Sequence, residues 1–97
     1  MWDGYRSTRW QRLRERILRR DGYHSREAAR YGNLRVEANV VHHCWPAEDY
    51  PEFSWEPWNL ISLTEEEHRS MHNADGSLTE LGESWRRRCR PPASPFS

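Results

Sequence analysis

Apolar residues near the start of the chain follow a helical period. Trp10, Leu13 and Ile17 recur at spacings of three and four residues, which predicts an amphipathic helix over residues 8–20. A serine or threonine at its start can cap it, and Gly22 is a natural residue to end it. The face opposite the apolar stripe is strongly basic and carries Arg9, Arg12, Arg16, Arg19 and Arg20.

Alternation replaces the helical period in the middle of the chain. Over residues 34–44, Val and Ala occupy one face while Glu and Asn occupy the other, which predicts a strand or a bent hairpin. Residues 45–58 hold three Pro and three Trp, and we interpret them as a long loop anchored by its aromatic side chains. Residues 59–63, Asn-Leu-Ile-Ser-Leu, predict a short second strand.

Two capping-box patterns predict helices in the last third of the chain. The Thr64–Glu67 box opens a helix that we expect to run to about His72. The Ser77–Glu80 box opens another, which we expect to continue through Trp85 into three arginines, where cations favour a helix C-terminus.

Length and composition limit the architecture. The chain has 97 residues, of which 35% are apolar and 31% charged, so it can bury one small core. We predict one α+β domain over residues 1–90 and a flexible Pro/Ser-rich tail over residues 91–97. Two cysteines are too few for a multi-bridge disulfide framework or a four-cysteine zinc site. No apolar run approaches the roughly 18–20 residues of a membrane span, and the start lacks a signal peptide, so we expect an intracellular protein with no membrane partner.

The formal net charge of zero conceals an uneven distribution. Residues 1–35 hold ten Arg and four acids, residues 36–85 hold one Arg and eleven acids, and residues 86–97 hold four Arg and no acid. All fifteen basic residues are Arg, whose planar guanidinium pairs bidentately with phosphate. Two basic ends therefore fit a nucleic-acid binder. Solvated helix faces would give the same pattern, so charge alone leaves both interpretations open.

Four of the five histidines form an ordered array with one asparagine. His42 and His43 end the first predicted strand, and Asn59 opens the second. His68 and His72 are four residues apart and are expected on one face of the predicted helix. A strand end and a helix face can converge on one metal ion. Taken singly, each residue could be an ordinary strand-end, turn or surface residue, and only the ordered array indicates a site.

This array resembles the HNH endonuclease family. The matching segments are Ile17–Tyr23, Val41–Pro46, Asn59–Leu63 and His68–His72. The resemblance covers roughly residues 8–85 and implies an α+β fold with a small ββα-metal core, in which a two-stranded hairpin precedes a helix. Helices at the N- and C-terminal ends would flank that core.

The resemblance also implies an activity, the metal-dependent hydrolysis of phosphodiester bonds in double-stranded DNA by nicking or by double-strand cleavage. His43 is implied to be the general base that activates water, and Asn59 to hold the loop that orients it. One divalent metal ion (Mn, Ni, Co, Zn or Mg) is implied, with His42, His68 and His72 as its ligands. Adjacent strand residues point to opposite faces, so His42 and His43 can serve one site only if the strand ends there.

The chain departs from the family pattern in one respect. Many small members carry two Cys-x-x-Cys pairs that bind a structural zinc ion. Ser25 and Ala28 occupy the positions of the first pair, and Thr64 and Glu67 those of the second. We therefore expect no structural zinc, with the capping box taking the place of a metal clamp at the start of the helix.

Two arginine groups are expected to hold the DNA backbone: Arg12, Arg16 and Arg19, and Arg86, Arg87 and Arg88. The resemblance also suggests phage packaging proteins as partners and the cytoplasm of a bacterial host cell as the location. The alternative is a non-catalytic DNA-binding or phage-assembly module on an HNH scaffold. Such a relic would be expected to lose His43 or Asn59, and neither is lost, which favours the enzyme.

Overall fold

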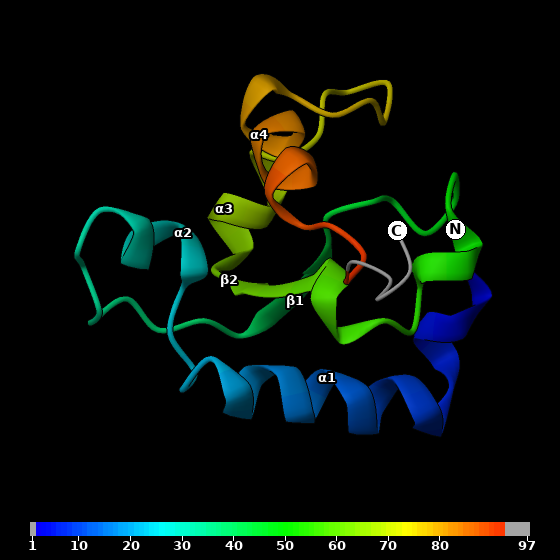
Figure 1. The fold of residues 1–97 in the computed structure, drawn as a ribbon, viewed down its shortest axis with the longest axis horizontal. Helices are drawn as coiled ribbons and strands as arrows, with labels where there is room; N and C mark the ends of the chain where they lie inside the picture. The colour runs from blue at the N-terminus through cyan, green and yellow to red at the C-terminus, as the bar shows by residue number, and fades with distance from the viewer. Residues whose placement is uncertain (1, 93–97) are drawn as a thin grey trace.

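A computed structural model describes residues 2–92, so most of the tail expected over residues 91–97 lies outside the described residues (Figure 1). Within this range the chain forms a compact α+β fold of four α-helices and one two-stranded antiparallel sheet. The helices are α1 (Thr8–Arg20), α2 (Arg26–Arg30), α3 (Glu65–Arg69) and α4 (Glu80–Arg88). The strands are β1 (Val40–His43) and β2 (Leu60–Leu63), and three 3₁₀ turns are η1 (Asp3–Arg6), η2 (Pro51–Phe53) and η3 (Pro57–Asn59). No helix in the described range is long and apolar enough for a membrane crossing.

Helix α1 has the boundaries that the sequence predicts. The Ser7 hydroxyl accepts a hydrogen bond from the backbone N–H of Trp10 at 3.0 Å, so Ser7 is the N-cap. At the other end Gly22 has a φ of +65°, and its N–H donates to the carbonyl of Arg19. This is the left-handed termination that glycine favours, and it turns the chain toward α2.

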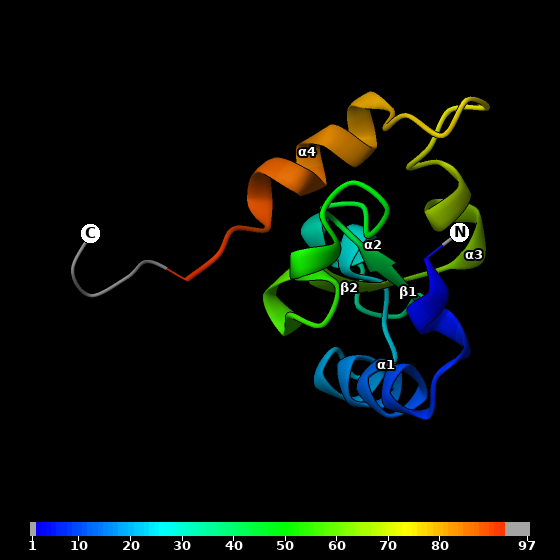
Figure 2. The same ribbon diagram turned by 90° about the vertical axis from the view of Figure 1, so that its right-hand side faces the viewer.

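The sheet separates two small cores. Opposed residues of β1 and β2 share a face, and the register pairs His42 with Ile61 and His43 with Leu60. Figure 2 shows α1 on one side of the sheet and α4 on the other. The core on the α1 side contains Trp10, Leu13, Ile17, Leu18, Ala38, Val41 and Leu60. The core on the α4 side contains Cys44, Ile61, Leu63, Met71, Trp85 and Cys89.

The first strand is shorter than the sequence predicts. The alternation covers residues 34–44, but β1 begins only at Val40. Residues 36–38 pair with the turn after α1, and only Asn39 still bonds to β2, through Leu63. The N–H of Ala38 donates to the carbonyl of Tyr23 at 2.7 Å, and Glu37 forms an isolated bridge with His24. Alternation thus identified the buried Ala38 correctly but overestimated the length of the strand.

Two helix boundaries in the last third also differ from the prediction. Helix α3 ends at Arg69 and does not reach His72, and Thr79, not Ser77, caps α4. The two residues after α3 bond to the residue that caps α4. The Thr79 hydroxyl donates to the carbonyl of Ser70, and its N–H donates to that of Met71. The chain therefore turns sharply, while Ser77 closes that turn by bonding to Asp75.

Hydrogen bonds link the four positions at which the HNH pattern would place zinc-binding cysteines, namely Ser25, Ala28, Thr64 and Glu67. The Glu67 carboxylate accepts from the Ser25 hydroxyl at 2.6 Å and from the N–H of Thr64 at 2.9 Å. The Ser25 oxygen accepts from the N–H of Ala28, and the Thr64 oxygen accepts from that of Glu67. This network joins the N-termini of α2 and α3, and Ser25 within it is 1% exposed. The capping box predicted at Thr64 is confirmed.

We expect Glu67→Ala to lower the free energy of unfolding by about 2 kcal/mol, because it removes the reciprocal cap and leaves the buried Ser25 hydroxyl without its acceptor. Thermal and urea unfolding measure this effect. Glu66→Ala is the matched control, since Glu66 is an exposed residue in the same first turn. If the two variants are equally stable, the network does not join the helices.

The wild-type protein should keep its helical circular dichroism signal after treatment with a chelator.

Candidate metal centre

Three histidines converge from different elements. His42 lies on β1, His68 on α3 and His72 in the turn after α3. One nitrogen of each imidazole lies within 4.8 Å of the other two. The ring centroids of His42 and His68 are 5.2 Å apart, and those of His42 and His72 are 5.6 Å apart. Imidazole nitrogens bind transition metals at about 2.0–2.1 Å, so side-chain rotations that bring the three nitrogens closer together would let them share one ion.

His42 has the surroundings of a metal ligand. Its side chain is 1% exposed, and its Nε2 has no hydrogen-bond partner among the described residues. A buried polar atom without a partner costs about 1–3 kcal/mol, which coordination would offset. Burial lowers the pKa of His42 well below 6.5, and repulsion from His68 and His72 lowers it further. The ring is therefore neutral at pH 7, the state that binds metal.

His68 and His72 complete the group of three imidazoles. His72 does not lie on the predicted helical face, because α3 ends before it, and an isolated bridge to Leu78 positions it instead. Burial and the neighbouring His72 lower the pKa of His68, while Glu65 opposes this shift. The Glu65 carboxylate itself lies 3.9 Å from the guanidinium of Arg69.

His43 lies on the other face of β1 and is held at both ring nitrogens. Its ring stacks on Trp10, with centroids 5.0 Å apart and an interplanar angle of 19°. Nε2 lies 3.0 Å from the carbonyl oxygen of Ser54, so Nε2 carries the proton and donates it. Nδ1 is then the acceptor, and the Tyr5 hydroxyl donates to it at 3.2 Å. Burial lowers the pKa of His43 to about 4, with repulsion from His68 adding to the shift and the Ser54 bond opposing it.

Asn59 ties together the loop between the strands. Its side chain is fully buried, and Oδ1 accepts from the N–H of Trp45 at 2.6 Å. Nδ2 donates to the carbonyls of Trp45 and Phe53, at 3.0 and 3.2 Å. Phe53 precedes Ser54, whose carbonyl orients His43, so Asn59 holds the segment that fixes the imidazole. These are the contacts that its expected role requires, and its effect on catalysis stays a prediction.

His42 and His43 border one cavity of about 260 Å³ even though they point to opposite faces of the sheet. Both can do so because β1 ends at His43, as the sequence indicates. The cavity is lined by Trp2, Tyr5, His42, His43, Pro46, Ala47, Glu48, Asp49, His68, His72 and Gly76. Four of these residues were not predicted as site residues from the sequence: Trp2 and Tyr5, which precede α1, and the acids Glu48 and Asp49. They belong to no motif, and only folding brings them to the histidines.

The two predicted arginine groups do not form one surface. Arg12 and Arg16 line a surface cavity with Trp55 on the α1 side, and Arg19 pairs with Glu15 at 3.5 Å. The other group belongs to α4, on the opposite side of the sheet (Figure 2). There Arg86 pairs with Glu83 at 2.9 Å, Arg87 pairs with Glu80 at 3.0 Å, and Arg88 lines a separate cavity.

We expect the metal-free protein to lose stability between pH 7 and pH 5. The unfolded chain takes up a proton on His43 near pH 6.5, whereas the folded chain does so only at about pH 4. The unfolded state therefore binds more protons as the pH falls, and unfolding becomes easier by about 2 kcal/mol at pH 5 from this residue.

Thermal melts in chelator across this pH range measure the effect. His43→Gln, which keeps a polar side chain but does not titrate, should show a shallower pH dependence. A melting temperature that is equally steep in both proteins would contradict the assignment to His43. A flat wild-type profile would contradict the shift itself.

Comparison with known proteins gives no match to a family model, to a curated protein or to a solved structure. The function must therefore be inferred from the side chains of the histidine cavity. Their chemistry is specific: three imidazoles can share one metal ion, and a fourth is fixed in one tautomer beside them.

Proposed function

We propose that this chain is a metal-dependent DNA endonuclease of the HNH type. Strands β1 and β2 with helix α3 would form its ββα-metal core. One observation carries the proposal: three converging imidazoles and a neutral, oriented fourth imidazole border the same cavity. Structural metal sites are usually closed, whereas this group of three leaves room for further ligands.

His42, His68 and His72 would hold the metal ion. A divalent cation supplies charge stabilisation for the phosphoryl oxygens and the departing 3′ oxygen of a phosphodiester. The three imidazoles are neutral donors, and the acids that line the cavity, Glu48 and Asp49, add negative charge at its wall.

His43 would act as the general base through Nδ1. Its Nε2–H is fixed by the Ser54 carbonyl, so the ring's basic lone pair is on Nδ1, the atom that would take a proton from water. The Tyr5 hydroxyl occupies that lone pair in the structure. The attacking water must therefore displace this hydroxyl, which is the hydrogen-bond donor in the contact.

Duplex DNA is the proposed substrate, because the surface of α1 offers arginines without a matching number of acids. Arg12 and Arg16 line a second cavity on this surface, separate from the histidine cavity. The Arg9 guanidinium lies 4.0 Å from the ring centroid of Trp55, which lines the same cavity. Arginines on this surface would bind the phosphate backbone, which carries no base sequence, so we propose cleavage with little sequence preference.

Supercoiled plasmid DNA with a panel of divalent metals tests the proposal. We expect nicked or linear products, with Mn²⁺, Ni²⁺ or Co²⁺ active at lower concentrations than Mg²⁺, since imidazoles suit these metals and magnesium prefers oxygen ligands. His24→Ala is the matched control, because His24 lies outside the group and should leave cleavage unchanged. Activity with Mg²⁺ alone would point to a carboxylate ligand and would contradict the three-histidine site.

The second candidate is a non-catalytic DNA-binding module. The observation that favours it is the engagement of both ring nitrogens of His43, whose side chain is only 4% exposed. DNA binding by fluorescence anisotropy with no cleavage in any metal would support this module over the enzyme.

A further inference from the structure

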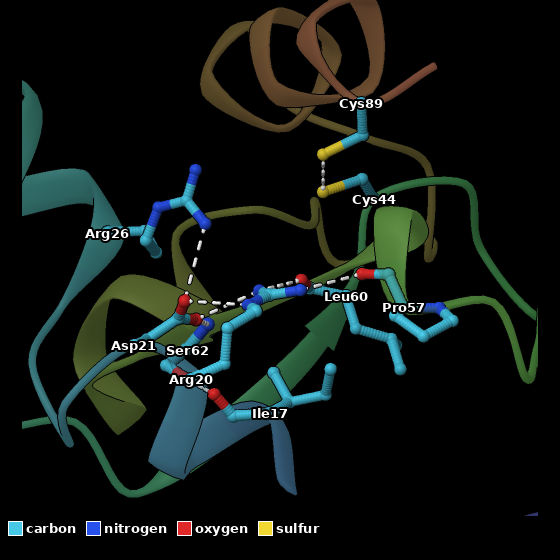
Figure 3. Close-up of polar contacts among 9 residues, drawn as sticks. All are labelled: Ile17, Arg20, Asp21, Arg26, Cys44, Pro57, Leu60, Ser62 and Cys89. Atoms are coloured by element: carbon cyan, nitrogen blue, oxygen red, sulfur yellow. Dashed lines mark hydrogen bonds and ion pairs between the residues drawn. The ribbon is translucent and has the colours of Figure 1, made fainter. Parts of the chain in front are cut away.

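The two cysteines meet although they are 45 positions apart in the sequence. Their sulfur atoms lie 2.7 Å apart, and both are free thiols. Figure 3 shows the two side chains pointing toward each other. Cys44 directly follows the end of β1, and Cys89 follows the end of α4. Their exposures are 0% and 8%, so the pair lies in the core on the α4 side of the sheet.

Backbone and side-chain contacts fix both cysteines. The N–H of Cys44 donates to the carbonyl of Asn59 at 2.8 Å, so Cys44 extends the pairing of the two strands. The indole N–H of Trp45 donates to the carbonyl of Cys89 at 2.6 Å, and the N–H of Cys89 donates to the carbonyl of Trp85 at 2.9 Å. The sulfur atoms therefore meet without a rearrangement of either segment.

Only one of the two cysteines borders a cavity from which a reagent could approach. Cys89 lines a cavity of about 550 Å³, whereas Cys44 does not. The same cavity is lined by five arginines: Arg20, Arg26, Arg30, Arg88 and Arg90. Asp21 pairs with Arg20 and Arg26, and Glu27 pairs with Arg30, so cations outnumber acids around this opening. An anionic reagent would be drawn to it.

The surroundings of Cys89 also favour its reactive form. The hydrogen-bond contact with Cys44 lowers the pKa of Cys89, and Arg26 and Arg20 lower it further, while burial opposes the shift. A lowered pKa increases the thiolate fraction, and the thiolate is the nucleophile in exchange reactions.

We propose that Cys44 and Cys89 are a modification site at which a reversible intramolecular disulfide forms. The oxidant would be a small anionic disulfide such as oxidised glutathione. The Cys89 thiolate attacks one sulfur of the oxidant, forms a mixed disulfide and expels one thiolate. Cys44 then attacks the Cys89 sulfur, its proton passes to the departing sulfur, and the second half of the oxidant leaves as a thiol. Two protein thiols are oxidised, and one disulfide of the oxidant is reduced to two thiols.

This disulfide would attach the end of α4 to the residue that follows His43. The closed loop contains most of the second half of the described chain, so the disulfide should restrict the unfolded state strongly. The inference is independent of DNA cleavage, since it needs neither the metal nor the substrate.

The test is to incubate the reduced full-length protein with oxidised glutathione in the presence of a chelator. We expect the intact mass to fall by two hydrogen atoms, and a non-reducing peptide map to contain one peptide pair joined through Cys44 and Cys89. The melting temperature should rise by about 10 °C and return after treatment with dithiothreitol. Persistence of two free thiols, under conditions that oxidise the protein in urea, would overturn the proposal. Exclusive formation of cross-linked dimers would do the same.

Two single variants test the order of attack. Cys44→Ser should accumulate a stable adduct of Cys89 with one glutathione, because the second thiol is missing. Cys89→Ser should stay unmodified, because Cys44 is buried and does not line the cavity. Equal modification of both variants would overturn the assignment of Cys89 as the attacking thiol. The wild-type peptide map decides on the disulfide itself, even if a variant folds poorly.

Discussion

His43→Ala is expected to reduce plasmid cleavage by about 10²–10⁴-fold while it changes metal affinity by less than about twofold. The physical reason is that His43 borders the histidine cavity but is not among the three converging nitrogens. Its Nδ1 lone pair, set by the Nε2–H bond to Ser54, is the proton acceptor that the reaction needs. Single-turnover cleavage and calorimetric titration with Ni²⁺ measure the two quantities separately.

The variant could also act through stability, because His43 stacks on Trp10 in the core beneath the cavity. His43→Gln is the companion variant, since it retains a polar side chain of similar length and has no basic nitrogen. Both variants should bind Ni²⁺ like the wild type, which shows that the cavity is intact. Near wild-type cleavage by either one would remove His43 from the role of base.

His42→Ala and His68→Ala are each expected to weaken Ni²⁺ or Zn²⁺ binding by at least about 100-fold and to abolish cleavage. Each removes one of three ligands, and His42 is the one buried deepest. In the wild type, a metal concentration of 100 times Kd should raise the free energy of unfolding by about 2.7 kcal/mol. The corresponding rise in melting temperature should be lost in both variants.

His72→Ala tests whether the third ligand is needed. His72 lies outside α3, and its Nδ1 is 3.4 Å from the carbonyl oxygen of Gly76. We expect loss of metal affinity here as well, with His24→Ala unchanged as the matched control. Full metal affinity in His72→Ala would reduce the site to two histidines and would direct the search for a third ligand to Glu48 and Asp49, which line the cavity.

The elements that local signals specify could be predicted from the sequence. The boundaries of α1 follow from the Ser7 cap and Gly22, and the start of α3 follows from the Thr64 capping box. Each of these signals acts through hydrogen bonds that span three or four residues, so the neighbouring sequence contains all the information needed. The second strand could also be predicted from local sequence, because its short apolar run is bounded by turn residues.

Boundaries that depend on a distant partner could not be predicted. Helix α3 stops before His72, where the N–H groups of Met71 and His72 bond three residues back and the chain turns so that Thr79 can bind the carbonyls of Ser70 and Met71. The alternation near Val40 overestimates β1, since the segment before it pairs with the turn after α1. Periodicity reports which side of a segment is buried, but it does not report which segment covers it.

By itself, the sequence determined an ordered histidine array, with His42 and His43 at a strand end and His68 on a helix, because such positions are visible as local spacing. The prediction of a helical position for His72 was wrong. Only the tertiary structure decided what surrounds them. The Tyr5 hydroxyl reaches Nδ1 of His43 across 38 positions, and the Ser54 carbonyl fixes its tautomer from the loop. Cys44 and Cys89 meet across 45 positions. Such contacts arise when α1 and α4 pack on opposite faces of the sheet, and burial of apolar surface has no preferred direction that a short stretch of sequence could encode.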